Sequence, residues 1–234
     1  MPRVDEERDG PLIRTVALPD HVYRVARKHA ALRYSEIRPE DDKDPAAGHR
    51  WDVLGGGVLY AGTTLRVAYV ETLGPHRTSS GLKLEKADDD VRFMSPKAVS
   101  ADWREQRAVF QLAATDDAPV REFVDLIDLG TRTALREVLE DFLRPMGVDH
   151  IDVPEVTSKN RLVTRTLARA LYSTSDDEGE PVYGGIKYMS RYDPKDECWA
   201  IFDHFPMEVV RQSPISAGDK TLLAAARDLD LTIF

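Results

Sequence analysis

The stretch from Gly48 to Leu73, GHRWDVLGGGVLYAGTTLRVAYVETL, carries signals for a turn, a strand and a helix in close succession. Its three consecutive glycines, residues 55–57, permit positive φ and predict a tight turn. The short apolar run that follows, residues 58–61, is typical of a buried strand. Two threonines then offer a hydroxyl N-cap for an amphipathic helix that contains one glutamate, Glu71. A carboxylate on the inward face of such a helix is either paired or functional, because burying it alone is costly.

Length, charge and cysteine content restrict the class of protein. A chain of 234 residues is long enough for one well-packed domain. The formal net charge of −9 argues against a general nucleic-acid binder, which needs a basic face. The first residues lack the apolar core of a signal peptide, and no apolar run approaches the roughly 18 residues of a membrane span. The single cysteine, Cys198, excludes an internal disulfide and is predicted to lie in the core. We therefore expect a cytoplasmic protein without direct contact to nucleic acid or membrane.

Local patterns along the rest of the chain predict an α+β fold in a single domain, with a mixed sheet and flanking helices. Strands are expected at residues 21–26, 91–94, 108–112, 122–127, 151–153, 183–190 and 198–202. Four helices are expected. The first ends at Gly74, a C′ glycine, and the second runs from 132 to 143 after a cap at Gly130 and Thr131. The third runs to Tyr172 after a cap at Thr157 or Ser158, and the last spans about 217–228. The elements lack a regular βαβ order, which disfavours a doubly wound sheet. Residues 1–20 are expected to form an N-terminal extension, and residues 27–49 a long loop of the kind that is often functional.

The spacing of glycines and histidines excludes several common sites. The glycines precede a strand instead of following one, so neither the dinucleotide-binding fingerprint nor the P-loop is present. The six histidines never fall at H-x-x-x-H spacing, and the single cysteine could supply only one metal ligand, so no metal site is expected. The G-x-S-x-G motif of serine hydrolases is absent from the sequence, so that class of enzyme is not expected.

A set of charged, hydroxyl and aromatic residues remains as the candidate site. Its members are Arg24, Arg50, Trp51, Tyr60, Glu71 and Ser190. Each has a structural alternative when it is taken alone. Arg24 and Glu71 would form a buried ion pair, Arg50 a surface cation, and the two aromatic residues part of the core, while the serine would be a turn hydroxyl. The basic helix with Arg161, Arg165 and Arg169 is either a solvated face or a surface for an acidic partner or for substrate phosphates.

Three stretches of the chain together resemble the RES-domain family, toxins of bacterial toxin–antitoxin pairs named for an Arg, a Glu and a Ser. They are VYRVA at 22–26, the quoted stretch at 48–73, and GIKYMSRYDPKDECWAIFD at 185–203. The family's usual order is an L-x-R strand, G-R-W, a Y-[AG] strand end, a T-A-x-x-E helix and a serine before the last strand pair. The chain departs from that pattern in its longer segment at residues 75–118 and at three motif positions. His49 stands where the family usually has glycine, Val67-Ala68 replaces Thr-Ala, and Met-Ser-Arg replaces Pro-Ser.

The resemblance implies a fold similar to ADP-ribosyltransferases and degradation of NAD⁺ by cleavage of its nicotinamide–ribose bond. Glu71 would stabilise the positive charge that this cleavage builds on the ribose. Arg24 and Arg50 would clamp the pyrophosphate. Tyr60 and Trp51 would flank the nicotinamide ring or the ribose, and Ser190 would donate to a substrate oxygen or position the nucleophile. The implied catalytic residues are thus Glu71, Arg24 and Ser190, and the implied binding residues are Arg50, Tyr60 and Trp51.

The resemblance also implies the ligands and partners. NAD⁺ would be a substrate and no prosthetic group is implied, while water or inorganic phosphate would be the acceptor. A cognate antitoxin and a second copy of the chain are the implied protein partners. Two alternatives stay open: transfer of ADP-ribose to a protein, and a non-enzymatic nucleic-acid or partner-binding module that uses the basic helix. The sequence leaves open the acceptor, the choice between NAD⁺ and NADP⁺, and whether His49 perturbs Arg50 or is an idle loop residue.

Overall fold

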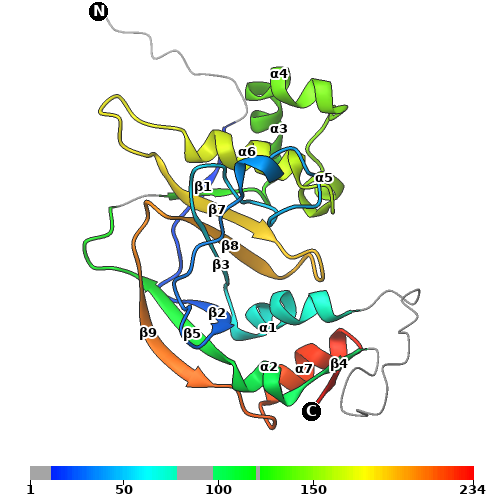
Figure 1. Cartoon of the computed structure of the whole chain (residues 1–234). Coiled ribbons are helices and arrows are strands. Elements are labelled where there is room, and N and C mark those ends of the chain that lie inside the picture. Colours follow the sequence, from blue (N-terminus) through cyan, green and yellow to red (C-terminus); the bar gives the residue numbers. More distant parts are fainter. Residues whose placement is uncertain (1–11, 78–96, 120–121) are drawn as a thin grey trace, which may run out of the picture.

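Eight strands form one mixed sheet in the computed structural model, which describes residues 12–77, 97–119 and 122–234 (Figure 1). The strands of this sheet are β1 (Thr15–Val16), β2 (Val22–Arg27), β3 (Val58–Gly62), β5 (Arg107–Ala114), β6 (Glu122–Asp125), β7 (Tyr183–Met189), β8 (Glu197–Phe202) and β9 (Met207–Pro214). Their order is β1-β6-β7-β8-β3-β2-β5-β9, and neighbours are antiparallel except β6 and β7. A separate parallel pair joins β4 (Ala98–Val99) to β10 (Thr232–Ile233).

Helices pack on the sheet in two groups. They are α1 (Leu65–Leu73), α2 (Ala101–Glu105), α3 (Leu129–Val138), α4 (Glu140–Leu143), α5 (Val153–Thr157), α6 (Leu162–Tyr172) and α7 (Lys220–Asp228), with 3-10 turns η1 (Pro39–Asp41), η2 (Gly74–His76) and η3 (Arg144–Met146). Helices α3 to α6 gather at one end of the molecule, and α1 and α7 lie side by side at the other (Figure 1). This mixture of helices with a mixed sheet confirms the α+β prediction. Among the described residues, no helix has the length and apolar character that crossing a membrane requires.

The sheet consists of two halves that meet at one ladder position. Strands β2 and β5 pair over six positions, and β3 and β8 pair over five, whereas β2 and β3 share only Tyr23 opposite Gly62. The two halves diverge from that point (Figure 1). Buried side chains of both halves fill the space between them, among them Leu59 and Ile201 from one half and Phe110 from the other. Residues of β2, β3 and the later part of α1 line a cavity on the other side.

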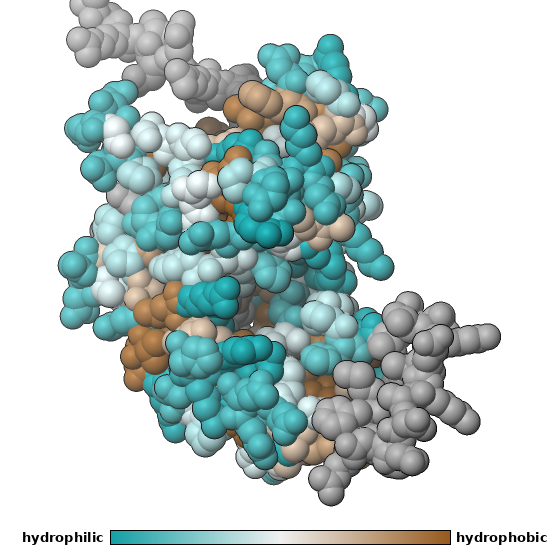
Figure 2. Space-filling view, viewed as in Figure 1, coloured by the Kyte–Doolittle hydropathy of each residue, from teal (hydrophilic) through white to brown (hydrophobic). Residues whose placement is uncertain are grey.

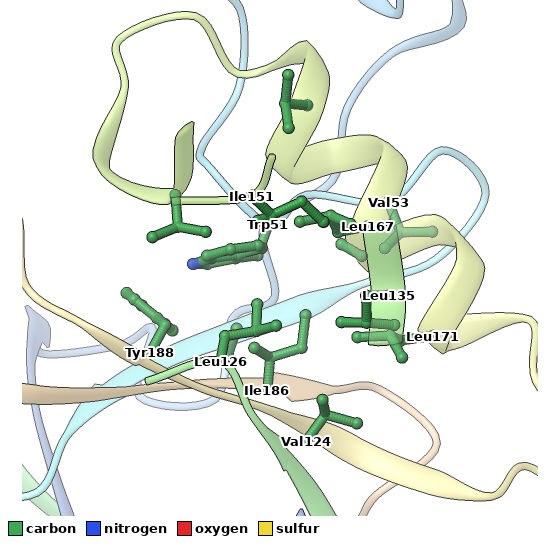
Figure 3. Close-up of a cluster of buried hydrophobic side chains, with 14 of the residues drawn as sticks. Trp51, Val53, Val124, Leu126, Leu135, Ile151, Leu167, Leu171, Ile186 and Tyr188 are labelled. Carbon is green, nitrogen blue, oxygen red and sulfur yellow. The ribbon is translucent and has the colours of Figure 1, made fainter. Parts of the chain in front are cut away.

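A large apolar cluster holds helices α3, α5 and α6 against the sheet. Trp51 lies between this helical layer and the sheet residues Tyr188 and Ile186, while Leu167 and Leu171 reach down from α6 (Figure 3). All five side chains are buried, and Trp51, Leu167 and Ile186 are fully so. Burying a side chain of this size stabilises the fold by roughly 1.5–3 kcal/mol. The cluster therefore fixes the segment that carries Trp51 firmly on the sheet.

Helix α1 is fixed by its own cap and by a second apolar cluster. The Thr64 hydroxyl accepts from the N–H of Val67 at 3.3 Å, as the sequence predicts. Tyr69 and Leu73 are fully buried in the cluster that α1 shares with α7. The Tyr69 hydroxyl also donates to Asp219, the N-cap of α7, at 2.7 Å. With its cap and its apolar side chains held in this way, α1 has one orientation.

Several predicted boundaries are wrong, and local polar chemistry explains them. Residues 151–153 do not form a strand, because Glu155 accepts from the N–H of Asp152 at 2.9 Å and starts α5 there. The helix expected from 132 to 143 begins at Leu129, where Asp128 and not Gly130-Thr131 is the cap, and it breaks at Leu139 into α3 and α4. Helix α6 begins at Leu162, so neither Thr157 nor Ser158 caps it.

Other differences concern single residues and an outer strand. Gly74 keeps right-handed helical dihedrals and leads into η2, so it is no left-handed C′ glycine. A Cβ at Gly74 would lie 2.0 Å from Cζ of Tyr192, so the Tyr192 ring packs directly on this glycine. Strand β9 was not expected; it is an edge strand of the sheet, and its Val209 and Val210 are exposed. Figure 2 shows brown surface on the side of the molecule where Figure 1 places β9. The strand expected at 91–94 lies outside the described residues.

The close approach of β7 to β8 at Gly185 gives a stability prediction. A Cβ at Gly185 would lie 2.2 Å from the carbonyl oxygen of Ala200, which is backbone and cannot move aside cheaply. We expect Gly185→Ala to lower the free energy of unfolding by about 2 to 3 kcal/mol, measured by urea denaturation. Gly218→Ala, where the nearest atom is 3.8 Å away, is the matched control and should stay within about 0.5 kcal/mol of the wild type. Equal midpoints for the two variants would contradict this packing.

Candidate active site

A cavity of about 1110 Å³ opens where β2, β3 and α1 meet. Its lining includes six arginines and two glutamates: Arg24, Arg33, Arg38, Arg50, Arg161, Arg191, Glu36 and Glu71. Five tyrosines and a histidine add flat surfaces: Tyr23, Tyr34, Tyr60, Tyr188, Tyr192 and His49. The cavity thus gathers positive charge in a chain whose net charge is −9. Such a concentration of guanidinium groups suits an anionic ligand, and phosphate groups in particular.

Asp52 organises the loop that enters the cavity. Its carboxylate is buried and accepts hydrogen bonds from the His49 N–H at 2.6 Å, the Ser35 hydroxyl at 2.9 Å and the Tyr60 hydroxyl at 2.8 Å. Gly48 makes this turn feasible, because its φ is +64° and a Cβ there would lie 2.8 Å from the Asp52 carboxylate. One carboxylate therefore joins the loop before β3, the loop after β2 and β3 itself.

Arg50 is a buried cation held on all sides. Its Nη1 donates to the carbonyls of Val156 at 3.2 Å and Met189 at 3.3 Å, at the ends of α5 and β7. Its guanidinium carbon lies 4.7 Å from the ring centre of Tyr188, and its Nη2 lies 3.9 Å from Oε2 of Glu71. A guanidinium that is 7% exposed needs such partners, because an unpaired buried charge is strongly destabilising.

Glu71 is fixed between Arg50 and Ser190. The fully buried Ser190 hydroxyl donates to Oε1 of Glu71 at 2.6 Å and accepts from the N–H of Tyr192 at 3.1 Å. The side chain of Glu71 is still 30% exposed, so the carboxylate faces the cavity as well as its two partners. The buried Cys198 lies beneath it, where burial first and the Glu71 carboxylate second raise the pKa of the thiol. The site therefore presents an oriented carboxylate at its inner wall.

Arg24 contributes a cation with an unused donor. Its Nη2 donates to the carbonyl of Arg33 at 2.8 Å, while its buried Nη1 has no hydrogen-bond partner among the described residues. Desolvation lowers the pKa of Arg24 to about 10, partly offset by Tyr34 and Tyr60, so the group stays charged at neutral pH. A buried donor without a partner is rare and calls for an explanation. An anion bound against Arg24 would supply the missing acceptor.

The structure brings most of the expected site residues together, in different roles. Arg24, Arg50, Tyr60 and Glu71 line the cavity. Ser190 lies behind Glu71 and orients it. The ion-pair partner of Glu71 within the described residues is Arg50, so the buried pair of Glu71 with Arg24 is not what forms.

The indole ring of Trp51 does not line the cavity. The ring is fully buried, with its centre 5.3 Å from that of Tyr188, and the backbone N–H of Trp51 donates to the Tyr60 hydroxyl at 3.0 Å. Trp51 is thus a core residue that supports the site from below (Figure 3). The expectation that it flanks a ligand ring does not agree with this position.

The arginines of α6 fasten the segment that leads to Arg50. Arg165 donates to the carbonyls of Asp42, Asp44 and Ala47 at 2.8, 2.8 and 3.1 Å. Arg161 donates to the carbonyls of Ala46, at 2.7 Å, and Gly48. The α6 arginines are therefore neither a wholly solvated face nor a docking surface of free cations, because backbone carbonyls of residues 42–48 occupy two of them.

Sequence reasoning missed several residues of the site. Asp52, Tyr188, Arg191 and Tyr192 were not singled out, although two of them directly follow Ser190 and one directly follows Trp51. Proximity to the candidate motif was thus an available signal. Among the described residues, no group of three or more His, Cys, Asp or Glu side chains could hold a metal ion.

Comparison with known proteins identifies one family. A model of the RES domain matches residues 21–222. That range covers most of the chain and includes every residue described above as lining the cavity. No curated protein matches the chain.

The three hydrogen bonds to Asp52 give a second stability prediction. Removal of the carboxylate in Asp52→Ala leaves three buried or half-buried donors without their acceptor. We expect the free energy of unfolding to fall by about 3 kcal/mol, and by only about 1 kcal/mol in Ser35→Ala, which removes one of the donors. Chemical denaturation of both variants measures the difference. Equal losses in the two variants would show that Asp52 is not the common acceptor that the structure gives it.

Proposed function

The chain belongs to the RES domain family, which is known in toxin–antitoxin systems, and from that premise we propose that it degrades NAD⁺ by cleaving the nicotinamide–ribose bond. The observation that carries the proposal is the Glu71 carboxylate, held by Ser190 and Arg50 at the wall of a cavity lined by six arginines. A dinucleotide has the two features that such a cavity fits: a pyrophosphate for the guanidinium groups and a ribose that becomes cationic during cleavage.

The proposed reaction begins with departure of nicotinamide. The bond between ribose C1′ and the pyridinium nitrogen breaks, and its electron pair leaves with the ring, which becomes neutral nicotinamide. Positive charge develops on C1′ and the ring oxygen of the ribose. The Glu71 carboxylate stabilises that charge electrostatically, because Ser190 and Arg50 hold it in place before the reaction begins. The oxygen of water or of a hydroxyl then bonds to C1′ and releases its proton to solvent, whereas inorganic phosphate bonds through an anionic oxygen.

The remaining residues of the cavity bind and orient the substrate in this proposal. Arg24, with its unused Nη1 donor, takes a pyrophosphate oxygen. Arg50 acts mainly on Glu71, because the two carbonyls of Val156 and Met189 already occupy its Nη1. The ring of Tyr60 provides a flat surface for the ribose or the nicotinamide, while its hydroxyl stays bonded to Asp52.

Three acceptors define three variants of the proposed activity. Water gives a glycohydrolase, inorganic phosphate gives a phosphorylase, and a protein side chain gives an ADP-ribosyltransferase. The first two are the leading form, in which loss of cellular NAD⁺ arrests growth until a cognate antitoxin blocks the cavity. A second copy of the chain is a further proposed partner. The similarity of the fold to ADP-ribosyltransferases is part of the same proposal.

The proposal predicts that Glu71→Gln strongly slows NAD⁺ cleavage. The amide keeps the size of the side chain and removes its charge, so we expect kcat for nicotinamide release to fall by about 10² to 10³. Chromatography of NAD⁺ incubated with purified protein, with and without inorganic phosphate, measures the release and identifies the acceptor from the second product. A labelled protein product would instead indicate ADP-ribosyl transfer.

A matched control separates this effect from a general loss of acidic charge. Glu208→Gln makes the same change on the exposed face of β9 and should retain wild-type turnover. Intact NAD⁺ in every sample of folded, antitoxin-free wild-type protein would contradict the proposed function. It would favour the binding-module alternative.

The role of Ser190 gives a separate prediction. Because its hydroxyl orients Glu71 without lining the cavity, Ser190→Ala should lower kcat by about 10- to 100-fold while KM changes little. Steady-state kinetics of nicotinamide release make this distinction. Ser216→Ala, in the loop before α7, is the control for loss of a serine hydroxyl. A rise in KM at unchanged kcat would show that Ser190 binds substrate instead of positioning the carboxylate.

A further inference from the structure

His49 occupies a position in the cavity to which the proposed chemistry gives no role. It lines the cavity and is accessible to solvent there. Its ring lies 5.3 Å from the ring of Tyr60, with an angle of 60° between the planes. Its backbone N–H donates to Asp52 at 2.6 Å, which anchors the residue at its base, while its imidazole lies at the cavity wall.

Charged and polar groups face His49 from the elements packed around it. Asp52 lies on its own loop, Tyr60 on β3, Arg24 on β2 and Arg161 at the start of α6. Desolvation by the cavity wall lowers the pKa of His49 first, and Arg161 and Arg24 lower it further, while Asp52 opposes them. The imidazole of the unliganded protein is therefore neutral at neutral pH, among groups that are already cationic.

We propose that His49 contacts the anionic part of the ligand and takes up a proton when the ligand binds, so that the cavity binds dinucleotides more tightly as the pH falls. This inference rests on the proposed function. It adds to that function a residue that recognises the ligand and a dependence of affinity on pH. The chemical class that His49 recognises is a pyrophosphate diester, whose charge is constant over the relevant pH range.

The sign of the effect follows from linkage between protonation and binding. In the empty cavity, Arg24 and Arg161 repel a proton on His49. A bound pyrophosphate brings negative charge among the same three groups, so it offsets this repulsion and raises the pKa of His49. The ligand gains affinity as the pH falls through the raised pKa, and the gain is complete below the pKa of the empty protein. A rise of one pKa unit corresponds to about tenfold in affinity.

ADP-ribose is the probe that isolates this effect, because it keeps the pyrophosphate and lacks the cleavable bond. We expect calorimetric titration of the wild-type protein to give a Kd roughly five- to tenfold lower at pH 5.5 than at pH 8. His49→Gln keeps a neutral polar side chain and should lose most of this dependence. His29→Gln, at an exposed histidine outside the cavity lining, should keep it.

Nuclear magnetic resonance supplies a second reading that does not depend on affinity. The imidazole C–H signal that disappears in His49→Gln should titrate below the ordinary histidine range in the free protein and shift to higher pH in the presence of saturating ADP-ribose. An affinity that is constant with pH, or one whose pH dependence survives in His49→Gln, overturns the role of His49 and leaves the proposed function intact. Absence of both ADP-ribose binding and NAD⁺ turnover contradicts the proposed function itself, and the inference falls with it.

Discussion

The buried guanidinium of Arg50 is the constraint around which the site is assembled. A charge in that position needs acceptors, and they come from separate parts of the chain: the carbonyls that end α5 and β7, the Tyr188 ring and the Glu71 carboxylate of α1. Satisfying one cation therefore brings the two helical groups and the sheet into a fixed relation. Arg50 also contacts the Glu71 carboxylate, and the hydroxyl of Ser190 donates to it, so the carboxylate is oriented toward the cavity. Stability of the core and orientation of the carboxylate thus depend on the same residue.

Hydrogen bonds fix the loop that carries Arg50 to the elements around it. Asp52 binds it to β3 and to the loop after β2, while Arg161 and Arg165 bind the preceding residues 42–48 to α6. Most of these bonds end on backbone carbonyls, which fix the path of the chain without using acidic side chains. Among the described residues, the acidic side chains that line the cavity are Glu36 and Glu71, against six arginines, of which Arg38 also pairs with Glu40 and Asp41 outside the lining. The result is a cationic site in an acidic protein, as a phosphate-containing substrate would require.

Sequence reasoning located the parts of the site that depend on short-range signals. The cap at Thr64, the turn before β3 and the position of Glu71 in α1 are all local, and they could be predicted from one stretch. The burial of Trp51 depends on residues that are distant in sequence, so no local pattern reveals it. Asp52 directly follows Trp51, but its bond to Ser35 in the loop after β2 shows only in the folded chain. The error at residues 151–153 was avoidable, because Asp152 and Glu155 have the spacing of a capping box. Strand β9 lacks regular alternation of apolar and polar residues, and only its pairing with β5 defines it.

The first measurement to make is a crystal structure of the Glu71→Gln variant soaked briefly with NAD⁺ and then flash-cooled, because slowed turnover leaves the substrate intact over a short soak. We expect the nicotinamide-bearing ribose against the side chain at position 71, close to Ser190, with the pyrophosphate on Arg24. We also expect His49 and Tyr60 within contact of the bound dinucleotide. A dinucleotide bound in the cavity with its adenosine at position 71, or bound elsewhere on the protein, would contradict the assignment of Glu71 as the group that stabilises the cationic ribose.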